Sequence, residues 1–533
     1  MLNLLSQNLS LLYKEFQMLN YTPVEWLQTV IKNCMKNLHL TEIPNHVPLS
    51  DTNAQLHSIY ENFTTAEQQY IHHLIQNQFK HNDALLILSY IINYLKVEGF
   101  EQDVADHVYN GDFDCFNQIM LETQLIFLNK VPPYNIMRKI HRKNISCLLA
   151  NTGISFPYIP LKDRNNNKIV IITEQLLQNT NHAPTLMTLE TAYALHKYFN
   201  YDIEIFTCAS NRLLSTYLWS LTTGFYSYDH HHLQISYKDA VLNAIQYPLD
   251  ASTLNDYREM ITYIHDLNPL FVLNIGANSP IADLPHLFTT VVNFNTVTTA
   301  PISEADIFIR CTKLDNALEN LYKQELSSHQ QQIFIKQNFP AITNISNKSF
   351  TRKELNLPED KFLICLVGNR LDTEVSPSFR QLICSILRLN STIDFVVIGT
   401  VHELKEHFEN TNYRDRIHYL GYCPDLLGIY RTLNLYLNPE RIGGGWSSAI
   451  ALRAGLPVVT LPNCDVAYNV SETFTVTNEE QMIETILQYA SDKVFYNTKH
   501  QQALDFASQN EENKIIDFLS EMLTKVKEAL PND

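Results

Sequence analysis

Glycine is scarce in this chain, with 13 glycines among 533 residues. Glycine is the residue that lets a backbone adopt left-handed turns or lie close to a ligand, so a glycine-poor chain has few places for either. Three of these glycines are nevertheless consecutive, at Gly443, Gly444 and Gly445. We therefore expect this run to serve a ligand, although a plain surface turn is the simpler alternative.

Long apolar runs and net positive charge are also lacking. No run reaches the length of about 18 residues that a membrane span needs, and the start, Met1-Leu-Asn-Leu-Leu-Ser, has no basic segment or cleavage site of a signal peptide. The formal net charge is -17, which argues against nucleic acid or an anionic membrane as the main partner. We expect a cytoplasmic protein whose basic cluster at 138–143 is a solvated linker face.

The cysteine pattern excludes the usual disulfide and zinc frameworks. The chain has nine cysteines, an odd number, and no C-x-x-C pair, so we expect reduced thiols. Asp229-His-His-His232 superficially suggests a metal site, but no further ligand stands at a matching spacing. No metal is predicted.

The length predicts about three units. Residues 1–150 are predicted to form an all-helical domain, because 65–75 and 83–95 show helical periodicity and glycine is nearly absent there. From Lys168 strands alternate with helices, which is typical of a parallel sheet and defines a second unit at 165–340. Its predicted strands are 168–173, 201–206, 270–274, 291–294 and 306–309, and its predicted helices are 184–198, one beginning near Ser210, and 254–267.

A polar stretch at 340–358 separates a third unit at 350–533. Its predicted strands are 362–368, 394–399, 417–421, 433–437 and 458–461. The tail from about Glu479 is predicted to be helical, with a last segment that can cross back to the middle unit.

The glycine run stands between a predicted strand and a predicted helix. Ser447 and Ser448 are good helix starters, Gly455 is a good stop, and an apolar strand resumes after Pro457. Unpaired amides and the dipole at a helix N-terminus attract a dianion. The segment therefore predicts a phosphate site.

Two Rossmann-like units with this motif in the second resemble the GT-B glycosyltransferases. The run from Asn438 to Leu461 is similar to the donor-binding segment of the group 1 (family 4-like) nucleotide-sugar transferases, and the resemblance is strongest over 360–490. It implies an α/β fold with two Rossmann-like domains in GT-B arrangement, here preceded by the all-helical N-terminal domain. It also implies a nucleotide-sugar donor as co-substrate, no further cofactor, and a protein or glycan acceptor.

The resemblance implies a donor site around the glycine run. Backbone amides there, with hydroxyls of the two serines, would hold the diphosphate, Arg370 would be the first cationic partner and Arg441 the second. Tyr422, with Cys423 and Pro424, would meet the base, and Asp465 would contact the ligand or merely cap a turn. The predicted donor-binding set is Asn369, Arg370, Tyr422, Glu440, Arg441, Gly443, Gly444, Gly445, Trp446, Ser447 and Ser448.

On the acceptor side, the loop after the strand ending at Thr173 should face the cleft. Glu174 and His182 are the candidates for acceptor positioning or proton removal, and with Arg370 they form the predicted catalytic set. An exposed loop histidine is the alternative for His182. Asn274, Gly276 and Asn278 end another strand and are candidates for lining the same cleft.

Two departures from the family pattern keep a rival hypothesis open. Ile450 stands where the family usually has a glutamate that holds the donor ribose, and isoleucine cannot accept a hydrogen bond. The lysine that commonly follows the Arg370 position is missing, with Glu374 nearby. The rival is a catalytically silent GT-B subunit that binds an acceptor or assists another transferase, and a nucleotide-sugar epimerase fits less well. The helical N-terminal domain resembles that of adhesin-modifying transferases, which implies a polypeptide acceptor or a protein partner.

Overall fold

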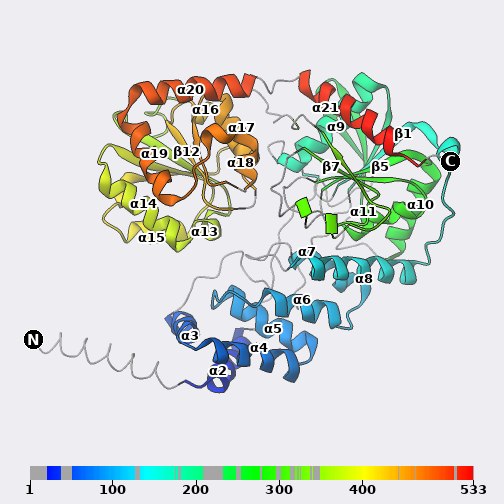
Figure 1. Cartoon of the computed structure of the whole chain (residues 1–533), viewed down its shortest axis with the longest axis horizontal. Helices are drawn as coiled ribbons and strands as arrows, with labels where there is room; N and C mark the ends of the chain where they lie inside the picture. The colour runs from blue at the N-terminus through cyan, green and yellow to red at the C-terminus, as the bar shows by residue number, and fades with distance from the viewer. Residues whose placement is uncertain are drawn as a thin grey trace, which may run out of the picture.

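The computed structural model places a group of N-terminal helices beside two α/β domains, which lie next to each other (Figure 1). The described residues are 21–37, 51–125, 133–173, 176–177, 182–207, 232–247, 254–276, 279–295, 302–311, 319–320, 323–324, 326–335, 339, 348–441, 443–462, 464–508 and 513–531.

The regular secondary structure of the N-terminal part is α-helical in its described residues. Its helices are α2 (Pro23–Asn37), α3 (Asp51–Glu61), α4 (Thr65–Gln78), α5 (His81–Asn93), α6 (Glu101–Asn110), α7 (Cys115–Leu125) and α8 (Tyr134–Thr152). Thr64 and Glu67 form a capping box that starts α4. The fully buried Trp26 packs against Tyr60, and Tyr60 packs against Phe100, so aromatic side chains from three helical segments fill this core.

The middle domain is built on an eight-stranded sheet. Its strands are β1 (Asn165–Thr173), β2 (Asp202–Thr207), β3 (His232–Tyr237), β4 (Ala240–Gln246), β5 (Pro269–Ile275), β6 (Val291–Phe294), β7 (Ile307–Arg310) and β8 (Gln331–Phe334), in the order β3-β4-β2-β1-β5-β6-β7-β8. All neighbours pair in parallel except β3 and β4, which form an antiparallel edge hairpin. The order reverses direction between β1 and β5, so the carboxyl ends of these two strands flank the sheet's switch point.

Helices cover both faces of this sheet. One face carries α9 (Ala183–Phe199) and α21 (Asn513–Ala529), and the other carries α10 (Leu254–Leu267), α11 (Pro280–Asp283) and the 3₁₀ turn η2 (Leu284–Leu287) together with α7 and α8. α21 is the end of the chain, so the last helix returns to the middle domain, as the sequence led us to expect (Figure 1). A further 3₁₀ turn, η1 (Leu161–Asp163), precedes β1.

Buried charges fix α8 to the middle domain. The Arg138 guanidinium donates to the carbonyl of Ser303 at 2.9 Å and pairs with Glu304 at 2.8 Å. His141 lies 2.6 Å from Glu122 and 2.7 Å from Asp283, with all three side chains buried. Burial disfavours the imidazolium, but the two carboxylates outweigh it and raise the pKa of His141 to about 10. The predicted solvated linker face is therefore wrong for Arg138 and His141, because partners 142 to 192 residues away in sequence bury them.

The C-terminal domain has a five-stranded parallel sheet. Its strands are β9 (Phe362–Val367), β10 (Ile393–Ile398), β11 (Ile417–Gly421), β12 (Leu435–Leu437) and β13 (Val458–Val459), in the order β11-β10-β9-β12-β13. Its helices are α13 (Leu371–Glu374), α14 (Pro377–Leu389), α15 (Glu403–Glu409), α16 (Leu426–Tyr430), α17 (Gly445–Arg453), α18 (Asp465–Val470), α19 (Glu479–Ser491) and α20 (Lys493–Ser508), with 3₁₀ turns η3 (Arg414–Arg416) and η4 (Glu472–Phe474). Here the order reverses between β9 and β12, and the loops after these strands meet at the switch point.

The predicted fold class is confirmed, with additions at one sheet. The ranges of α10, β6 and β11 agree with the sequence-based ranges, whereas β3, β4 and β8 were missed. The β3–β4 hairpin makes the middle sheet mixed at its edge, which corrects the expectation of a purely parallel sheet. The helix predicted to begin near Ser210 lies outside the described residues.

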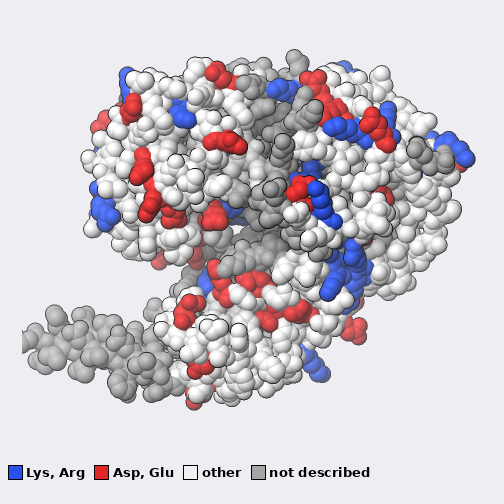
Figure 2. All heavy atoms as spheres, viewed as in Figure 1, with Lys and Arg blue, Asp and Glu red and all other residues white. Residues whose placement is uncertain are grey.

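Charge is mixed on the face shown in Figure 2, where acidic and basic side chains are interspersed over the described parts of all three bodies. Among the described helices, none combines the length and apolar character that crossing a bilayer requires.

Candidate functional site

The glycine loop, residues 443–445, makes a left-handed turn at Gly443 and Gly444, and Gly445 begins α17. Gly443 and Gly444 have φ of 96° and 83°, values that side chains with a Cβ rarely adopt. The Gly443 amide donates to an Asp465 carboxylate oxygen at 2.6 Å, which closes the turn against α18. Asp465 was predicted either to contact the ligand or to cap a turn, and this bond shows that it supports the turn.

The first amides of α17 follow directly from the turn. Within the described part of the chain, the amides of Gly445, Trp446 and Ser447 find no hydrogen-bond acceptor, because the first α-helical bond runs from the Ser448 amide to the Gly444 carbonyl. Unpaired amides at a helix N-terminus favour an anion. The helix start that the sequence predicted after the glycine run is therefore present, and phosphate binding there stays a prediction.

A chain of hydrogen bonds supports the loop from below. Arg441 donates to the Tyr436 hydroxyl at 2.8 Å, and this hydroxyl lies 2.9 Å from the Ser447 hydroxyl. Ser447 in turn donates to the Gly444 carbonyl at 2.9 Å. The Ser447 hydroxyl donates its proton to the Gly444 carbonyl, so the Tyr436 hydroxyl must be the donor in its bond with Ser447.

Arg441 is the buried centre of this support. Its side chain is 3% exposed and also donates to Asn438, to the Val367 carbonyl at the end of β9, and to Glu374. A Cβ on Gly444 would lie 2.7 Å from the guanidinium, so the loop rests directly on it. Arg441 thus lies beneath the loop with its donors engaged, and its direct contact with a donor phosphate stays a prediction.

Arg370 lies at the rim of the same loop. Its side chain is 58% exposed and pairs with Glu374 at 2.8 Å, and a Cβ on Gly443 would lie 3.0 Å from its Nη2. Glu374 therefore binds two arginines, one with each oxygen. The carboxylate that stands near the place of the family's lysine orients the exposed guanidinium beside the glycine loop.

Trp446, next to the glycine loop, lies at the boundary between the two α/β domains. This half-buried side chain packs both against the core of the C-terminal domain and against the core that contains β1, α9 and α21. Figure 1 shows α17 and α18 on the side of the C-terminal domain that faces the middle domain. The open amides of α17 consequently lie where a ligand can be held between two domains.

The other residues of the predicted donor site differ in exposure and in their hydrogen-bond partners. Ser448 is fully buried, and its hydroxyl donates to the Gly445 carbonyl within its own helix. Asn369 is exposed and accepts a bond from the Thr400 amide, while Glu440 and Tyr422 are exposed. Cys423 lies beside the Leu420 carbonyl. Their predicted contacts with the nucleotide stay predictions.

Ile450 occupies a position where no carboxylate could replace it without cost. It is 8% exposed and belongs to the apolar core formed by β9, β12 and α16. Ile450 therefore cannot take over the hydrogen bond to the donor ribose that the glutamate of the family pattern would make.

On the middle domain, His182 begins α9 in the loop after β1, at that sheet's switch point. Its Nδ1 lies 2.8 Å from the Thr185 hydroxyl, and burial lowers its pKa to about 4. The imidazole is therefore neutral at physiological pH. Glu174 and Asn278 lie outside the described residues, and so does most of the Asp229–His232 run.

Asn274 and Gly276 stand at the carboxyl end of β5. Asn274 is fully buried, and neither polar atom of its side chain has a hydrogen-bond partner among the described residues. Gly276 accepts a bond from the Asn293 side chain of the neighbouring strand. Within the described part of this edge, buried polar groups therefore lack partners at a place where the sequence predicted Asn274, Gly276 and Asn278 to line a cleft.

Sequence reasoning missed three supporting residues of the glycine loop. Tyr436 and Asn438 hold Arg441, and Asn438 also donates to Thr460 at 3.1 Å. Glu374 was noted as a departure rather than as a partner. The available signal was a tyrosine and an asparagine interrupting the end of an apolar strand, since buried polar groups need partners.

Comparison with known proteins identifies the fold. No protein-family model and no curated protein matches this chain. A mutant O-GlcNAc transferase from Thermobaculum terrenum is structurally similar, with a TM-score of 0.52 and 12% identity over 96% of this chain and 98% of that one. HepE from Anabaena, solved with UDP and glucose, has a TM-score of 0.47 and 13% identity over 68% and 100% of the two chains. The trehalose-6-phosphate synthase OtsA has a TM-score of 0.49 and 11% identity over 68% and 100%.

The first similarity carries the conclusion, because its TM-score exceeds 0.5 and it spans nearly all of both chains. The chain has the GT-B fold of the glycosyltransferases, in which two Rossmann-like domains face each other. The match covers 96% of this chain, so it extends beyond the two α/β domains into the N-terminal helices.

Proposed function

We propose that this protein is a glycosyltransferase that moves a sugar from a nucleotide diphosphate-sugar donor to a protein or glycan acceptor. The observation that carries the proposal is the set of open amides at the start of α17, beside Arg370 and at the boundary with the middle domain. The GT-B fold is consistent with this activity, although a fold alone does not define a reaction.

The proposed chemistry follows from where positive charge lies. Breaking the bond between sugar and diphosphate leaves negative charge on the leaving group, and preoriented donors lower the barrier to that step. The amides of Gly445, Trp446 and Ser447 would bind the diphosphate directly, with Arg370 beside them. Arg441 would add its charge from below without leaving its four partners.

Glu374 has a defined role in this proposal. Its carboxylate holds the Arg370 guanidinium at the rim of the glycine loop, which reduces the rotamer entropy lost when phosphate binds. The same carboxylate offsets the charge of Arg441 when no donor is bound. Arg370 would then be preorganised for an anion that arrives from the side of the middle domain.

On the acceptor side, we propose that His182 orients the acceptor by hydrogen bonding. A pKa of about 4 makes it a weak proton acceptor at neutral pH, and Nδ1 is already beside Thr185. Glu174 remains the proposed general base. The helical N-terminal part is the proposed contact for a polypeptide acceptor or partner protein, with the reaction in the cytoplasm.

The test is a turnover assay on the purified full chain. UDP-, GDP- and ADP-sugars are supplied singly, and the released nucleoside diphosphate is measured with and without candidate acceptor peptides and glycans. We expect release from one donor class, lost in Arg370→Ala and retained in Arg388→Ala, a change of an exposed arginine in the last turn of α14. No release from any donor, with or without an acceptor, would count against transfer.

One observation favours the rival function, a catalytically silent subunit that binds an acceptor or assists another transferase. Ile450 packs into the apolar core at the position of the family's ribose ligand. A silent subunit predicts nucleotide binding or acceptor binding without any release of nucleoside diphosphate. The same assay, paired with a binding measurement, therefore separates the two functions.

A further inference from the structure

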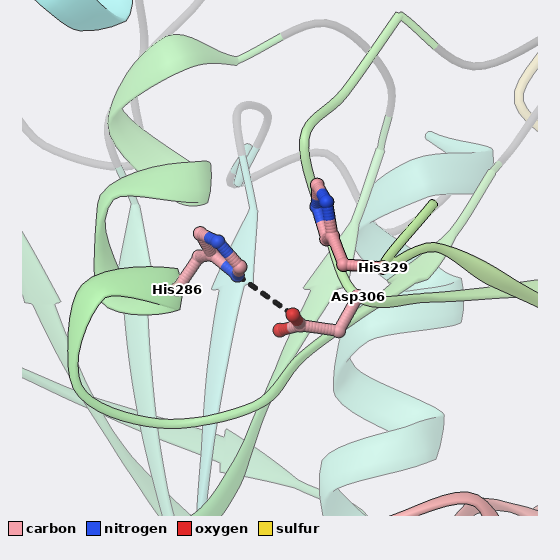
Figure 3. A group of neighbouring side chains, drawn as sticks. All are labelled: His286, Asp306 and His329. Atoms are coloured by element: carbon pink, nitrogen blue, oxygen red, sulfur yellow. Dashed lines mark hydrogen bonds and ion pairs between the residues drawn. The ribbon is translucent and has the colours of Figure 1, made fainter. Parts of the chain in front are cut away.

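Two histidines and an aspartate from separate segments gather at the amino edge of the middle sheet. His286 lies in η2, Asp306 directly precedes β7, and His329 lies in the turn before β8. Their potential ligand atoms all lie within 4.8 Å of one another. Figure 3 shows the three side chains together, with the His286 ring directed at the Asp306 carboxylate.

The Asp306 carboxylate is anchored in a way that suits a ligand. One oxygen accepts a bond from the Val291 amide at 2.7 Å, and the other lies 2.7 Å from His286 Nδ1. Such backing of a ligand by the backbone is typical of metal centres, where outer partners fix the orientation of the inner ones. The rings of His286 and His329 lie 4.9 Å apart between centroids, at 31°.

Small side-chain movements would complete a metal site. Bonds of about 2.0–2.1 Å in a tetrahedral arrangement place ligand atoms about 3.3 Å apart. His286 and Asp306 would separate slightly as a metal replaces the proton between them, and the exposed His329 would close toward them. Three protein ligands leave one position for water.

The ligand chemistry selects the class of metal. Imidazole nitrogens with one carboxylate suit zinc and neighbouring transition metals, whereas calcium and magnesium prefer sites made of oxygen alone. Because the site lies at the amino ends of parallel strands, it is at the opposite edge from the loop that carries His182. It is therefore separate from the proposed transfer chemistry.

The same segments dock the N-terminal helices. Ser303 and Glu304, just before Asp306, bind Arg138 of α8, and Gln330, next to His329, accepts a bond from the same guanidinium. Gln330 also donates to the Ser303 and Ala305 carbonyls, which ties the two ligand-bearing segments together. Fixing His329 and Asp306 would fix the surface on which α8 rests.

We propose that His286, Asp306 and His329 form a site for a zinc-type transition metal that stabilises the docking of α8 on the middle domain. The proposal does not depend on the glycosyltransferase activity, since it concerns a different edge of the domain. It predicts one metal ion per chain at these residues.

The test uses Co²⁺ as a spectroscopic probe and Zn²⁺ as its competitor on the full chain. We expect one equivalent of Co²⁺ to give visible absorption typical of a four-coordinate site, displaced by Zn²⁺ and unaffected by Mg²⁺. His329→Gln should weaken Zn²⁺ binding by at least about tenfold, the scale on which even outer-shell partners act. His265→Gln, which changes a histidine of the same domain outside the cluster, should not.

The docking claim has its own measurement. Zn²⁺ should slow amide hydrogen exchange in α8 of the wild-type chain and of His265→Gln, and leave exchange in His329→Gln unchanged. Equal Zn²⁺ affinity in wild type and His329→Gln would overturn the site. A bound metal that leaves exchange in α8 unchanged would overturn its proposed role in docking.

Discussion

Glu374 binds Arg441 at 2.8 Å beneath the glycine loop, and with its other oxygen it binds Arg370 at 2.8 Å. One carboxylate thus connects a buried arginine that supports the loop with an exposed arginine at its rim. This pairing explains why a residue of opposite charge can stand near the position of a lysine in the family pattern.

Removing this carboxylate should strongly destabilise the C-terminal domain. Glu374→Ala leaves the buried Arg441 charge without its partner, which costs about 3 kcal/mol in comparable cases. The control is Glu409→Ala, because Glu409 is in an exposed pair with Lys405 at 3.7 Å and should cost less than about 1 kcal/mol. Urea unfolding followed by circular dichroism measures both, and equal losses would contradict the role given to Glu374.

The Tyr436 hydroxyl should matter more than other buried hydroxyls. Tyr436→Phe breaks the chain from Arg441 to Ser447 and should cost about 2 kcal/mol. Tyr419→Phe in β11 removes a buried hydroxyl that has no hydrogen-bond partner in the described part of the chain, so its cost should be near zero. Both are measured by thermal unfolding, and a Tyr436→Phe protein as stable as Tyr419→Phe would remove the hydrogen-bond chain from the account.

Gly444 should not tolerate a side chain. Gly444→Ala adds left-handed strain of about 1–2 kcal/mol and a Cβ that would lie 2.7 Å from the Arg441 guanidinium. Gly153→Ala at the end of α8 adds the strain alone, since no described atom beyond its two chain neighbours lies within 4 Å of the added Cβ. Nucleotide affinity, measured by calorimetry, should fall for Gly444→Ala and be unchanged for Gly153→Ala. An unchanged affinity in Gly444→Ala would show that the loop is not a ligand site.

The buried His141 gives the docking of α8 a pH dependence. Its pKa is raised to about 10 in the folded chain, against an ordinary value of 6.5. A raised histidine pKa stabilises the folded state fully below the unfolded pKa, and this stabilisation is lost as pH rises through the folded pKa. Thermal stability should therefore fall between pH 6.5 and 10 in wild type, and less steeply in His141→Gln. Parallel pH profiles for the two proteins would contradict the assignment.

The sequence predicted the secondary structure and fold class well, but it predicted the side-chain contacts between domains poorly. Strongly apolar segments such as β6 and β11 were found with their observed bounds, because buried parallel strands are marked by continuous hydrophobicity. The β3–β4 hairpin was missed because β3 has no continuous apolar run, although it alternates buried and exposed residues as half-buried strands do. The burial of Arg138 and His141 could not be predicted, because it depends on partners on another domain.

In the candidate site, too, local features were predicted from the sequence and long-range contacts were not. The glycine loop and the start of α17 were predictable, since both depend on local residue types. The support of the loop was not, because Arg441 reaches Val367 and Glu374, which precede it by 67 residues or more and come from β9 and α13. Local sequence therefore predicted where a ligand binds, and the structure added the contacts that support this place.

Calorimetric titration of the full chain with UDP, GDP and ADP tests the donor site most directly. We predict that one of them binds with one site per chain, that Arg370→Ala weakens it about tenfold or more, equal to 1.4 kcal/mol or more, and that Arg388→Ala does not. Failure of all three nucleotides to bind, or equal affinity in wild type and Arg370→Ala, would contradict the proposed diphosphate site.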